Sequence, residues 1–190
     1  MATKESQVVS ISENRVTPSL PRLLNLGCGN DYHAGWLNVD LSPEVRADQH
    51  FDAFSFPWDL PDSYFDQILI SHLAEHIPHA IPGVPGDGFY AFFEEVYRIL
   101  GTHGVAEVRV PFWKHPNATL DPTHVRIIHK KTFDFFDPSH ISHYMTGAKF
   151  KVRSKVIWSD RFTLKVNSRF GWRLPGLRRT ELRAYLSKLA

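Results

Sequence analysis

Short apolar runs alternate with polar loops along most of the chain, the pattern of an α/β domain built around a buried, mostly parallel sheet. These runs predict strands at residues 22–26, 37–40, 49–51, 66–71 and 104–110. An amphipathic helix is expected at residues 89–100, because apolar residues recur there at intervals of three and four positions. Its apolar side is expected to pack on the sheet.

The connecting and closing segments carry weaker patterns. Residues 78–88 contain three prolines and three glycines, which predicts a loop before the helix. A short helix is expected at 130–136. Segments 149–158 and 161–168 alternate between apolar and polar residues and predict a closing antiparallel pair, and residues 177–189 are expected to form a final helix.

The most informative motif is Leu-Asn-Leu-Gly-Cys-Gly at 24–29, with Asp40 following at the end of the second predicted strand. Glycines at positions 27 and 29 let the backbone turn sharply and approach a ligand closely. A carboxylate at the tip of the neighbouring strand can accept hydrogen bonds from both hydroxyls of a ribose. Tyr32 stands where the dinucleotide fingerprint needs its third glycine, and no P-loop lysine follows. The pattern favours a phosphate-free nucleoside cofactor, and S-adenosylmethionine fits best.

These motifs resemble the class I S-adenosylmethionine-dependent methyltransferases, and among them a small bacterial subgroup of predicted methyltransferases. The resemblance covers roughly residues 20–137 and rests on six segments in matching order: 24–29, 35–40, 65–77, 93–100, 104–111 and 121–124. It implies a Rossmann-like α/β fold, with a mostly parallel sheet, helices on both faces and an antiparallel edge near the C-terminus. The first crossover, between Gly29 and Asp40, is shorter than is usual for a crossover with its helix.

The resemblance also implies which residues hold the cofactor. The turn of Gly27, Cys28 and Gly29 and the carboxylate of Asp40 are expected to bind it, with the Cys28 side chain as a small buried filler. A nucleophilic role for this cysteine would need a nearby base. Three further residues are expected to contact the adenine or the methionine half: Asp52 after the third strand, and Ser71 and His72 after the fourth.

A candidate catalytic pair follows the fifth predicted strand, at the sheet edge that overlooks the cofactor cleft. Methyl transfer is an in-line displacement, so alignment supplies most of the rate enhancement. A base is needed only if the acceptor is a hydroxyl or a protonated amine. His124, oriented by Asp121, is the candidate base. The alternative is a loop turn at Asp121 in which His124 satisfies backbone groups.

His72-x-x-Glu75-His76 matches the H-x-x-E-H zinc-peptidase motif, which gives a minor alternative function. Pro78 ends any helix one residue after Ile77, which leaves too short a helical frame for two histidines to grip one ion. The preceding residues also form a buried strand in the methyltransferase order. We therefore expect no metal site.

Charge is segregated along the chain although the net charge is only +2. Residues 149–190 hold 12 of the 22 Lys and Arg residues and two of the 20 acidic residues. Such a basic segment suggests an anionic partner, either RNA or an anionic membrane surface. The alternative is that this segment folds back on the acidic body of the domain or pairs with another subunit.

Size and composition predict one domain. A chain of 190 residues can bury a sizeable core, so residues 21–190 are expected to form a single domain after a flexible polar arm at 1–20. The N-terminus leads into no apolar stretch, which predicts no signal peptide, and no apolar run approaches the roughly 18 residues of a membrane span. Cys28 is the single cysteine, which excludes an internal disulfide and favours a cytoplasmic location.

Taken together, these patterns predict S-adenosylmethionine-dependent methyl transfer to an acceptor that enters over residues 111–124. A small molecule, a glycan or a lipid is the favoured acceptor, and the sequence does not identify it. The main alternative is a non-catalytic S-adenosylmethionine-binding module whose basic segment docks an anionic partner. No residue excludes this module, because the class has no universal catalytic side chain.

Overall fold

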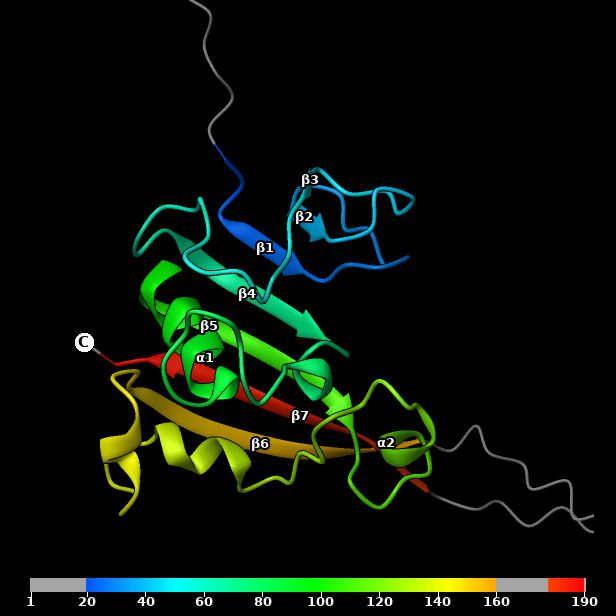
Figure 1. The fold of residues 1–190 in the computed structure, drawn as a ribbon, viewed down its shortest axis with the longest axis vertical. Coiled ribbons are helices and arrows are strands. Elements are labelled where there is room, and N and C mark those ends of the chain that lie inside the picture. The colour runs from blue at the N-terminus through cyan, green and yellow to red at the C-terminus, as the bar shows by residue number, and fades with distance from the viewer. Residues whose placement is uncertain (1–19, 160–177, 190) are drawn as a thin grey trace, which may run out of the picture.

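The computed structural model describes residues 20–159 and 178–189, which form a seven-stranded sheet with helical segments packed against it (Figure 1). The strands are β1 (Leu23–Leu26), β2 (Leu37–Asp40), β3 (Gln49–His50), β4 (Phe65–Ser71), β5 (Leu100–Pro111), β6 (Phe150–Ser159) and β7 (Arg178–Lys188). Their order across the sheet is β3-β2-β1-β4-β5-β7-β6. Neighbours from β3 to β5 are parallel, and β7 runs antiparallel to both β5 and β6.

This sheet confirms the predicted mostly parallel arrangement with an antiparallel C-terminal edge. The first four predicted strands are found within one residue of their expected ends, and β5 begins four residues earlier than expected, at Leu100. The strand expected at 149–158 is β6. The strand expected at 161–168, and the arm expected at 1–20 apart from Leu20, lie outside the described residues.

The C-terminal helix expected at 177–189 is wrong, because this segment is β7 and lies between β5 and β6. Leu182 and Leu186 are four positions apart and fit a helix as well as a strand, so local periodicity does not separate the two structures. In the sheet, β7 pairs with the edge of β5 that would otherwise be open, with Ala184 opposite Val108. Arg183 therefore lies on a strand and not on the expected helix.

Helix α1 (Gly88–Ile99) confirms the helix expected at 89–100, and its apolar face, with Phe92, Phe93 and Val96, is completely buried. The other helical segments are short: η1 (Ala74–His76), α2 (Asn117–Leu120), η2 (Thr132–Phe136) and η3 (His143–Met145). The helix expected at 130–136 is the 3-10 helix η2. None of the helices in the described part of the chain is long and apolar enough to cross a bilayer.

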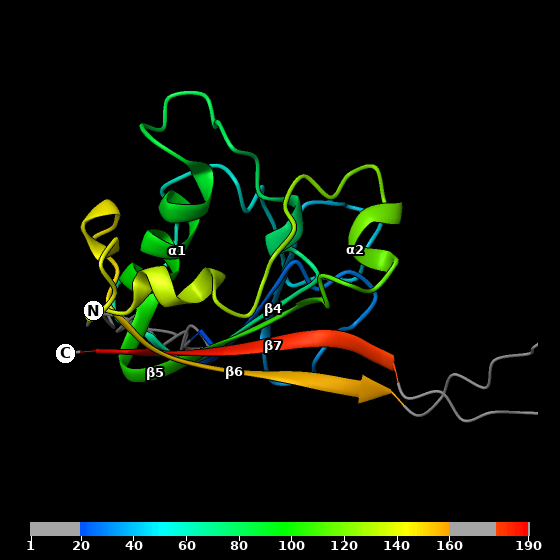
Figure 2. The same cartoon turned by 90° about the horizontal axis from the view of Figure 1, so that it is seen from below.

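The described helices all lie on one side of β5, β7 and β6 (Figure 2). Burial along β7 agrees with this view: Leu182 and Leu186 are fully buried, whereas Arg183 and Tyr185 on the opposite face are partly exposed. The helices expected on the second face are therefore not found among residues 20–159 and 178–189. The connections between β1 and β4 contain turns and bends in place of crossover helices, so they supply no helix to the second face.

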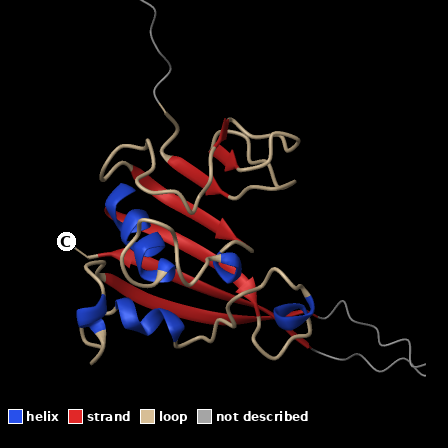
Figure 3. Cartoon of the chain, viewed as in Figure 1, coloured by secondary structure: helices blue, strands red, loops and turns tan. Residues whose placement is uncertain are grey.

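Two buried asparagines anchor the crossover from β1 to β2, which has turns but no helix, as its length predicts (Figure 3). Asn25 Nδ2 donates to Asp31 O at 2.7 Å and to Asn38 Oδ1 at 3.1 Å. Asn38 Oδ1 also accepts from His33 N at 2.8 Å, and Asn38 Nδ2 donates to Asp48 Oδ2 at 2.9 Å. These side chains satisfy loop backbone groups that a crossover helix would have paired internally.

Replacing Asp87 by alanine is expected to destabilise the fold by about 1–2 kcal/mol, because Asp87 is the N-cap of α1 and accepts from Phe89 N at 2.8 Å. Burial alone would raise the pKa of Asp87, but hydrogen bonds from Phe89 N and from the Arg126 and His79 side chains outweigh burial and lower it. The stabilisation that depends on the charge is therefore present above the ordinary pKa of about 3.9 and is lost as the pH falls through the lower folded-state pKa.

Urea unfolding of the wild type, Asp87→Ala and Asp87→Asn, from neutral pH down to acid, measures the contribution of the helix cap and that of the carboxylate charge. Asparagine also caps helices well, so Asp87→Asn should lose less stability than Asp87→Ala at neutral pH. The difference between wild type and Asp87→Asn should shrink in acid. An alanine variant as stable as the wild type at neutral pH would contradict the capping role.

Candidate functional site

The glycine turn after β1 is held against the end of β2. Gly27 and Gly29 have φ angles of 69° and 49°, in the left-handed region that favours glycine. The N–H groups of Gly27 and Cys28 donate to Val39 O at 2.8 and 2.9 Å. Asp40 Oδ2 accepts from Gly29 N at 2.8 Å. The structure therefore brings together the turn and the carboxylate that the sequence singled out.

Asp40 keeps acceptor capacity for a ligand. Its second oxygen, Oδ1, accepts from Ser42 N at 2.9 Å. Each carboxylate oxygen has two lone pairs, so one lone pair on each oxygen remains after these backbone bonds. The side chain is partly exposed at the end of β2. Such a carboxylate can accept two further hydrogen bonds from a diol.

The glycine turn also meets the segment that follows β4. A Cβ on Gly27 would lie 3.0 Å from Leu73 Cδ2, a tight contact that Leu73 would have to relieve by shifting, and the φ angle of Gly27 also favours glycine. Ser71 ends β4, and His72 follows with a φ of 54°, which is uncommon for a residue other than glycine. The ends of β1 and β4 thus meet at the carboxyl edge of the sheet, where ligands bind in open α/β folds.

His72 lies between two carboxylates. Its Nδ1 is 3.3 Å from Glu75 Oε1, and its Nε2 is 3.7 Å from Glu181 Oε2. The interactions with Glu181 and Glu75 outweigh burial and raise the pKa of His72 to about 9. The side chain is therefore a cation at neutral pH. Glu181 belongs to β7, so the helix expected there concealed this contact.

Asp52 and Cys28 both have structural contacts. Asp52 lies two residues beyond β3, is exposed, and accepts from Phe54 N at 2.8 Å. This bond caps a turn and leaves the carboxylate accessible. Cys28 is buried, and burial, followed by the charge of Asp40, raises the pKa of its thiol. A raised pKa suits a packing role and disfavours a nucleophile.

A cleft of about 570 Å³ opens beside the same edge of the sheet. His72 and His76 line it from the segment after β4, Asp121 and His124 from the loop after β5, and Thr180 from β7. Both predicted catalytic residues therefore face one cleft, together with two histidines of the H-x-x-E-H motif. An acceptor entering this cleft would reach the end of β4.

The side chains of Asp121 and His124 are neighbours without a hydrogen bond between them, although His124 N donates to Asp121 O at 3.2 Å. Asp121 Oδ2 is 3.7 Å from His124 Nε2. Asp121 Oδ1 accepts from the Oγ1 and the N–H of Thr123, at 2.6 and 2.9 Å, and these bonds lower the pKa of Asp121. The loop turn considered as an alternative is thus present.

Glu75 is a site residue that sequence analysis considered only within the peptidase motif. Its side chain is 3% exposed, and its Oε1 lies 4.0 Å from His124 Nε2. The backbone O of Glu75 accepts from the N–H groups of Val125 and Arg126, which ties the loop after β5 to η1. Its Oε2 is buried without a hydrogen-bond partner in the described part of the chain. The H-x-x-E-H motif drew attention to Glu75 in the sequence, but it did not indicate that Glu75 lies close to His124.

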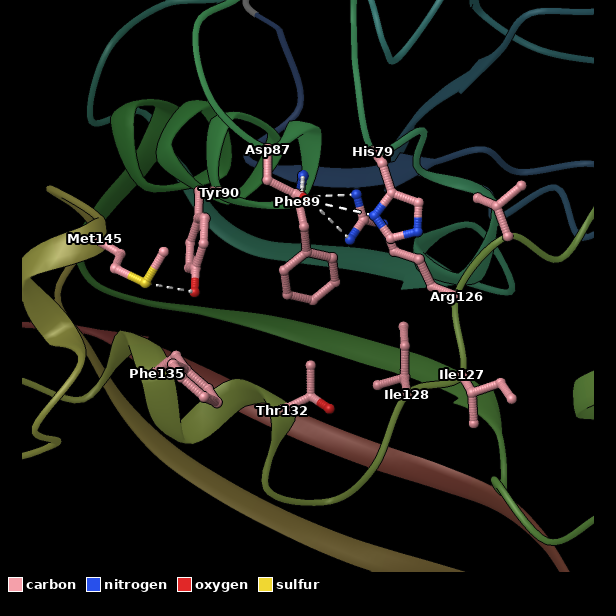
Figure 4. A pocket seen from close by; sticks show the side chains of 11 residues that line it. His79, Asp87, Phe89, Tyr90, Arg126, Ile127, Ile128, Thr132, Phe135 and Met145 are labelled. Atoms are coloured by element: carbon pink, nitrogen blue, oxygen red, sulfur yellow. Dashed lines mark hydrogen bonds and ion pairs between the residues drawn. The ribbon is translucent and has the colours of Figure 1, made fainter.

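A second cavity, of about 400 Å³, lies between the start of α1 and residues 125–145 (Figure 4). Its lining is mostly apolar and includes Phe89 and Met145. Arg126 Nη2 donates to Asp87 Oδ1 at 2.7 Å, so this guanidinium is already paired. None of the predicted site residues lines the cavity, and we assign it no role.

Several solved structures share this fold at low sequence identity. A SAM-dependent methyltransferase from Archaeoglobus fulgidus has a TM-score of 0.57 and 18% identity, with 90% of this chain and 87% of that chain covered. A Haloferax volcanii protein assigned as a methyltransferase, in complex with the Trm112 methyltransferase activator, has a TM-score of 0.57 and 14% identity, with coverage of 88% and 82%. A protein from Bacillus halodurans, also assigned as a methyltransferase, has a TM-score of 0.53 and 14% identity, with coverage of 88% and 92%.

No family model and no curated relative matches the sequence. The structural similarity therefore establishes the fold. The chain has the Rossmann-like methyltransferase fold that the sequence predicted.

Proposed function

We propose that this protein is an S-adenosylmethionine-dependent methyltransferase. The observation that carries the proposal is the hydrogen bond from Gly29 N to Asp40 Oδ2, at 2.8 Å, in a fold shared with methyltransferase structures. In this proposal the backbone of residues 27–29 lines the cofactor, and Asp40 accepts hydrogen bonds from both ribose hydroxyls.

The remaining cofactor contacts follow from position. The methionine half would lie near Ser71 and His72, because they stand at the carboxyl end of β4, where ligands bind in open α/β folds. Asp52, beyond the end of β3, would contact the adenine. These two assignments place the ends of the cofactor on opposite sides of Asp40.

The acceptor would enter the cleft lined by His76, Asp121 and His124. Its nucleophilic atom attacks the methyl carbon in line with the sulfonium, and the S–CH₃ bond breaks as the new bond forms. The electron pair stays on sulfur, and S-adenosylhomocysteine leaves. For a hydroxyl acceptor, the released proton passes to His124, whose positive charge the Asp121 carboxylate 3.7 Å away stabilises. A small molecule, glycan or lipid that carries a hydroxyl is the acceptor class we favour.

A non-catalytic cofactor-binding module is the second candidate function. The exposed side chains of Lys151, Arg153 and Lys155 alternate along β6 and so lie on one face of the sheet, where they would suit an anionic partner. Cofactor affinity does not separate this module from an enzyme, whereas turnover does. The anionic partner of segment 149–190 and the cytoplasmic location stay predictions.

A zinc peptidase based on the H-x-x-E-H motif is disfavoured. η1 has three residues, Ala74–His76, so His72 and His76 are not presented by a regular helix. Both ring nitrogens of His72 also lie near carboxylates, which keeps the ring protonated and unavailable as a metal ligand.

The cofactor assignment is tested by thermal unfolding with S-adenosylhomocysteine. At a concentration one hundred times its Kd, a ligand that binds only the folded state adds about 2.7 kcal/mol, which is roughly 5–10 °C for a chain of this size. NAD at the same concentration is expected to give no shift, because the turn lacks the pyrophosphate fingerprint. A shift with NAD and none with S-adenosylhomocysteine would overturn the assignment. Transfer of a labelled methyl group to candidate hydroxyl acceptors then separates an enzyme from a binding module.

A further inference from the structure

We propose that Glu75, His76 and His124 form a binding site for a divalent transition-metal ion such as Zn²⁺, beside the cleft after β4. The two histidines come from different segments of the chain, η1 and the loop after β5. The expectation of no metal considered the pair His72 and His76. The structure brings together a different trio.

The geometry of the three side chains suits one ion. One ligand atom from each residue lies within 4.8 Å of the others, and the His76 and His124 rings are 4.7 Å apart in an edge-to-face arrangement. Bound zinc holds nitrogen and oxygen ligands at roughly 2.0–2.2 Å, so small side-chain movements would close this trio around an ion.

Two buried polar groups in the trio lack partners. Glu75 Oε2 and His124 Nδ1 have no hydrogen bond among the described residues, and the two side chains are 3% and 8% exposed. His124 Nε2 is 4.0 Å from Glu75 Oε1 and 3.7 Å from Asp121 Oδ2, both beyond hydrogen-bond distance. Unsatisfied buried groups of this kind are costly, and a bound ion is one of the established ways to satisfy them. A cation on Glu75 Oε2 would leave the contact between Oε1 and His72 in place.

His76 is oriented as a metal ligand is. Its Nδ1 lies 3.2 Å from the backbone O of Thr123 and 3.1 Å from Thr123 Oγ1. A proton on Nδ1, donated to the carbonyl, leaves the Nε2 lone pair free. Ligating histidines usually hold their second nitrogen in this way, which fixes the ring and raises its basicity.

The donor set selects the class of ion. Two imidazoles and one carboxylate suit zinc or iron, whereas magnesium and calcium prefer oxygen ligands. His76 and His124 line the cleft of about 570 Å³, so an ion has a route of entry. Three protein ligands leave at least one coordination position open, which is typical of a site that binds a substrate oxygen.

The metal site does not depend on the cofactor assignment, but its role does. If the methyltransferase proposal holds, the cation would bind the acceptor oxygen and lower the pKa of its hydroxyl, so that a separate base is unnecessary. A nitrogen of His124 that binds the metal cannot also take the proton of the acceptor, so at that nitrogen His124 is either a metal ligand or the base. The metal content of the active protein therefore decides between these two roles.

The experiment uses the untagged full chain, freed of metal by a chelator and dialysed. Titration with Zn²⁺ by calorimetry, checked by elemental analysis, should give one tightly bound ion per chain. Removing a residue that only hydrogen-bonds to a metal ligand typically lowers metal affinity 10- to 100-fold. Removing a ligand itself should cost at least as much, so His76→Ala and His124→Ala should each weaken zinc binding by about 100-fold or more. His103→Asn is the matched control: His103 is exposed near the start of β5, at the opposite edge of the sheet, and asparagine tolerates its φ of 67°.

Absence of stoichiometric zinc in the wild type, or full zinc binding in both His76→Ala and His124→Ala, would overturn the proposal. Glu75→Gln probes the carboxylate, and if it fails to fold, the partly exposed His76 still gives the decisive variant. The thermal shift with S-adenosylhomocysteine is measured on the same proteins. A retained shift without zinc binding would reject the metal site alone, and zinc binding without a shift would reject only the cofactor assignment.

Discussion

Replacing Asp40 by alanine is expected to weaken S-adenosylhomocysteine binding by ten- to a hundredfold. Hydrogen bonds to a charged group contribute about 1.5–3 kcal/mol, and every 1.4 kcal/mol is a factor of ten in affinity. The carboxylate also holds the turn, since its two oxygens accept from Gly29 N and Ser42 N. Its loss should therefore disorder the binding turn as well as remove the contacts to the ribose. Calorimetric titration of the folded variant measures the effect.

Asp31→Ala is the matched control for this prediction. Asp31 follows the same turn, but its carboxylate is 68% exposed and pairs only with His33 among the described contacts. Its removal should leave the affinity within a factor of about three, since exposed ion pairs contribute little. An equal loss of S-adenosylhomocysteine affinity in Asp40→Ala and Asp31→Ala would indicate a general effect of removing negative charge near the turn. A folded Asp40→Ala protein that binds as the wild type does would remove Asp40 from the cofactor site.

Replacing Arg98 by alanine is expected to cost about 3–5 kcal/mol of folding free energy, because it leaves the buried charge of Glu95 without its partner. Arg98 Nη2 and Nε donate to the two oxygens of Glu95 at 2.6 and 2.9 Å, and the Glu95 side chain is 9% exposed. Glu95 Oε1 also accepts from Trp58 N at 2.7 Å. This network holds the loop before β4 against α1, so its loss should destabilise the packing of that loop on the helix.

Arg22→Ala provides the comparison for Arg98. Arg22 also forms a two-bond pair with a carboxylate, Asp66, but the side chains are 53% and 59% exposed. Such a surface pair is expected to contribute little to the folding free energy, because water screens the two charges. Urea unfolding followed by circular dichroism measures both variants. A similar, small loss for Arg98→Ala would show that water reaches Glu95 and that the buried network is not needed for the fold.

Local sequence pattern was sufficient for strands β1 to β6, for α1 and for the glycine turn with Asp40. The glycine turn and Asp40 are eleven positions apart and meet across adjacent strands, so a short motif contains the whole arrangement. The apolar period of residues 89–100 identifies α1 because one face must pack on the sheet. The short crossover could likewise be predicted, since ten residues do not hold a crossover with its helix.

The sequence alone determined the strand-turn-strand unit that carries Asp40, because its residues interact with near neighbours in the chain. Only the tertiary structure decided that residues 178–188 form a strand, because an apolar spacing of four fits either structure and the open edge of β5 selected between them. That strand brings Glu181 to His72, and the loop after β5 brings His124 to Glu75. These pairs are far apart in sequence and meet because strand order and loop path place them at one sheet edge, which no local period encodes.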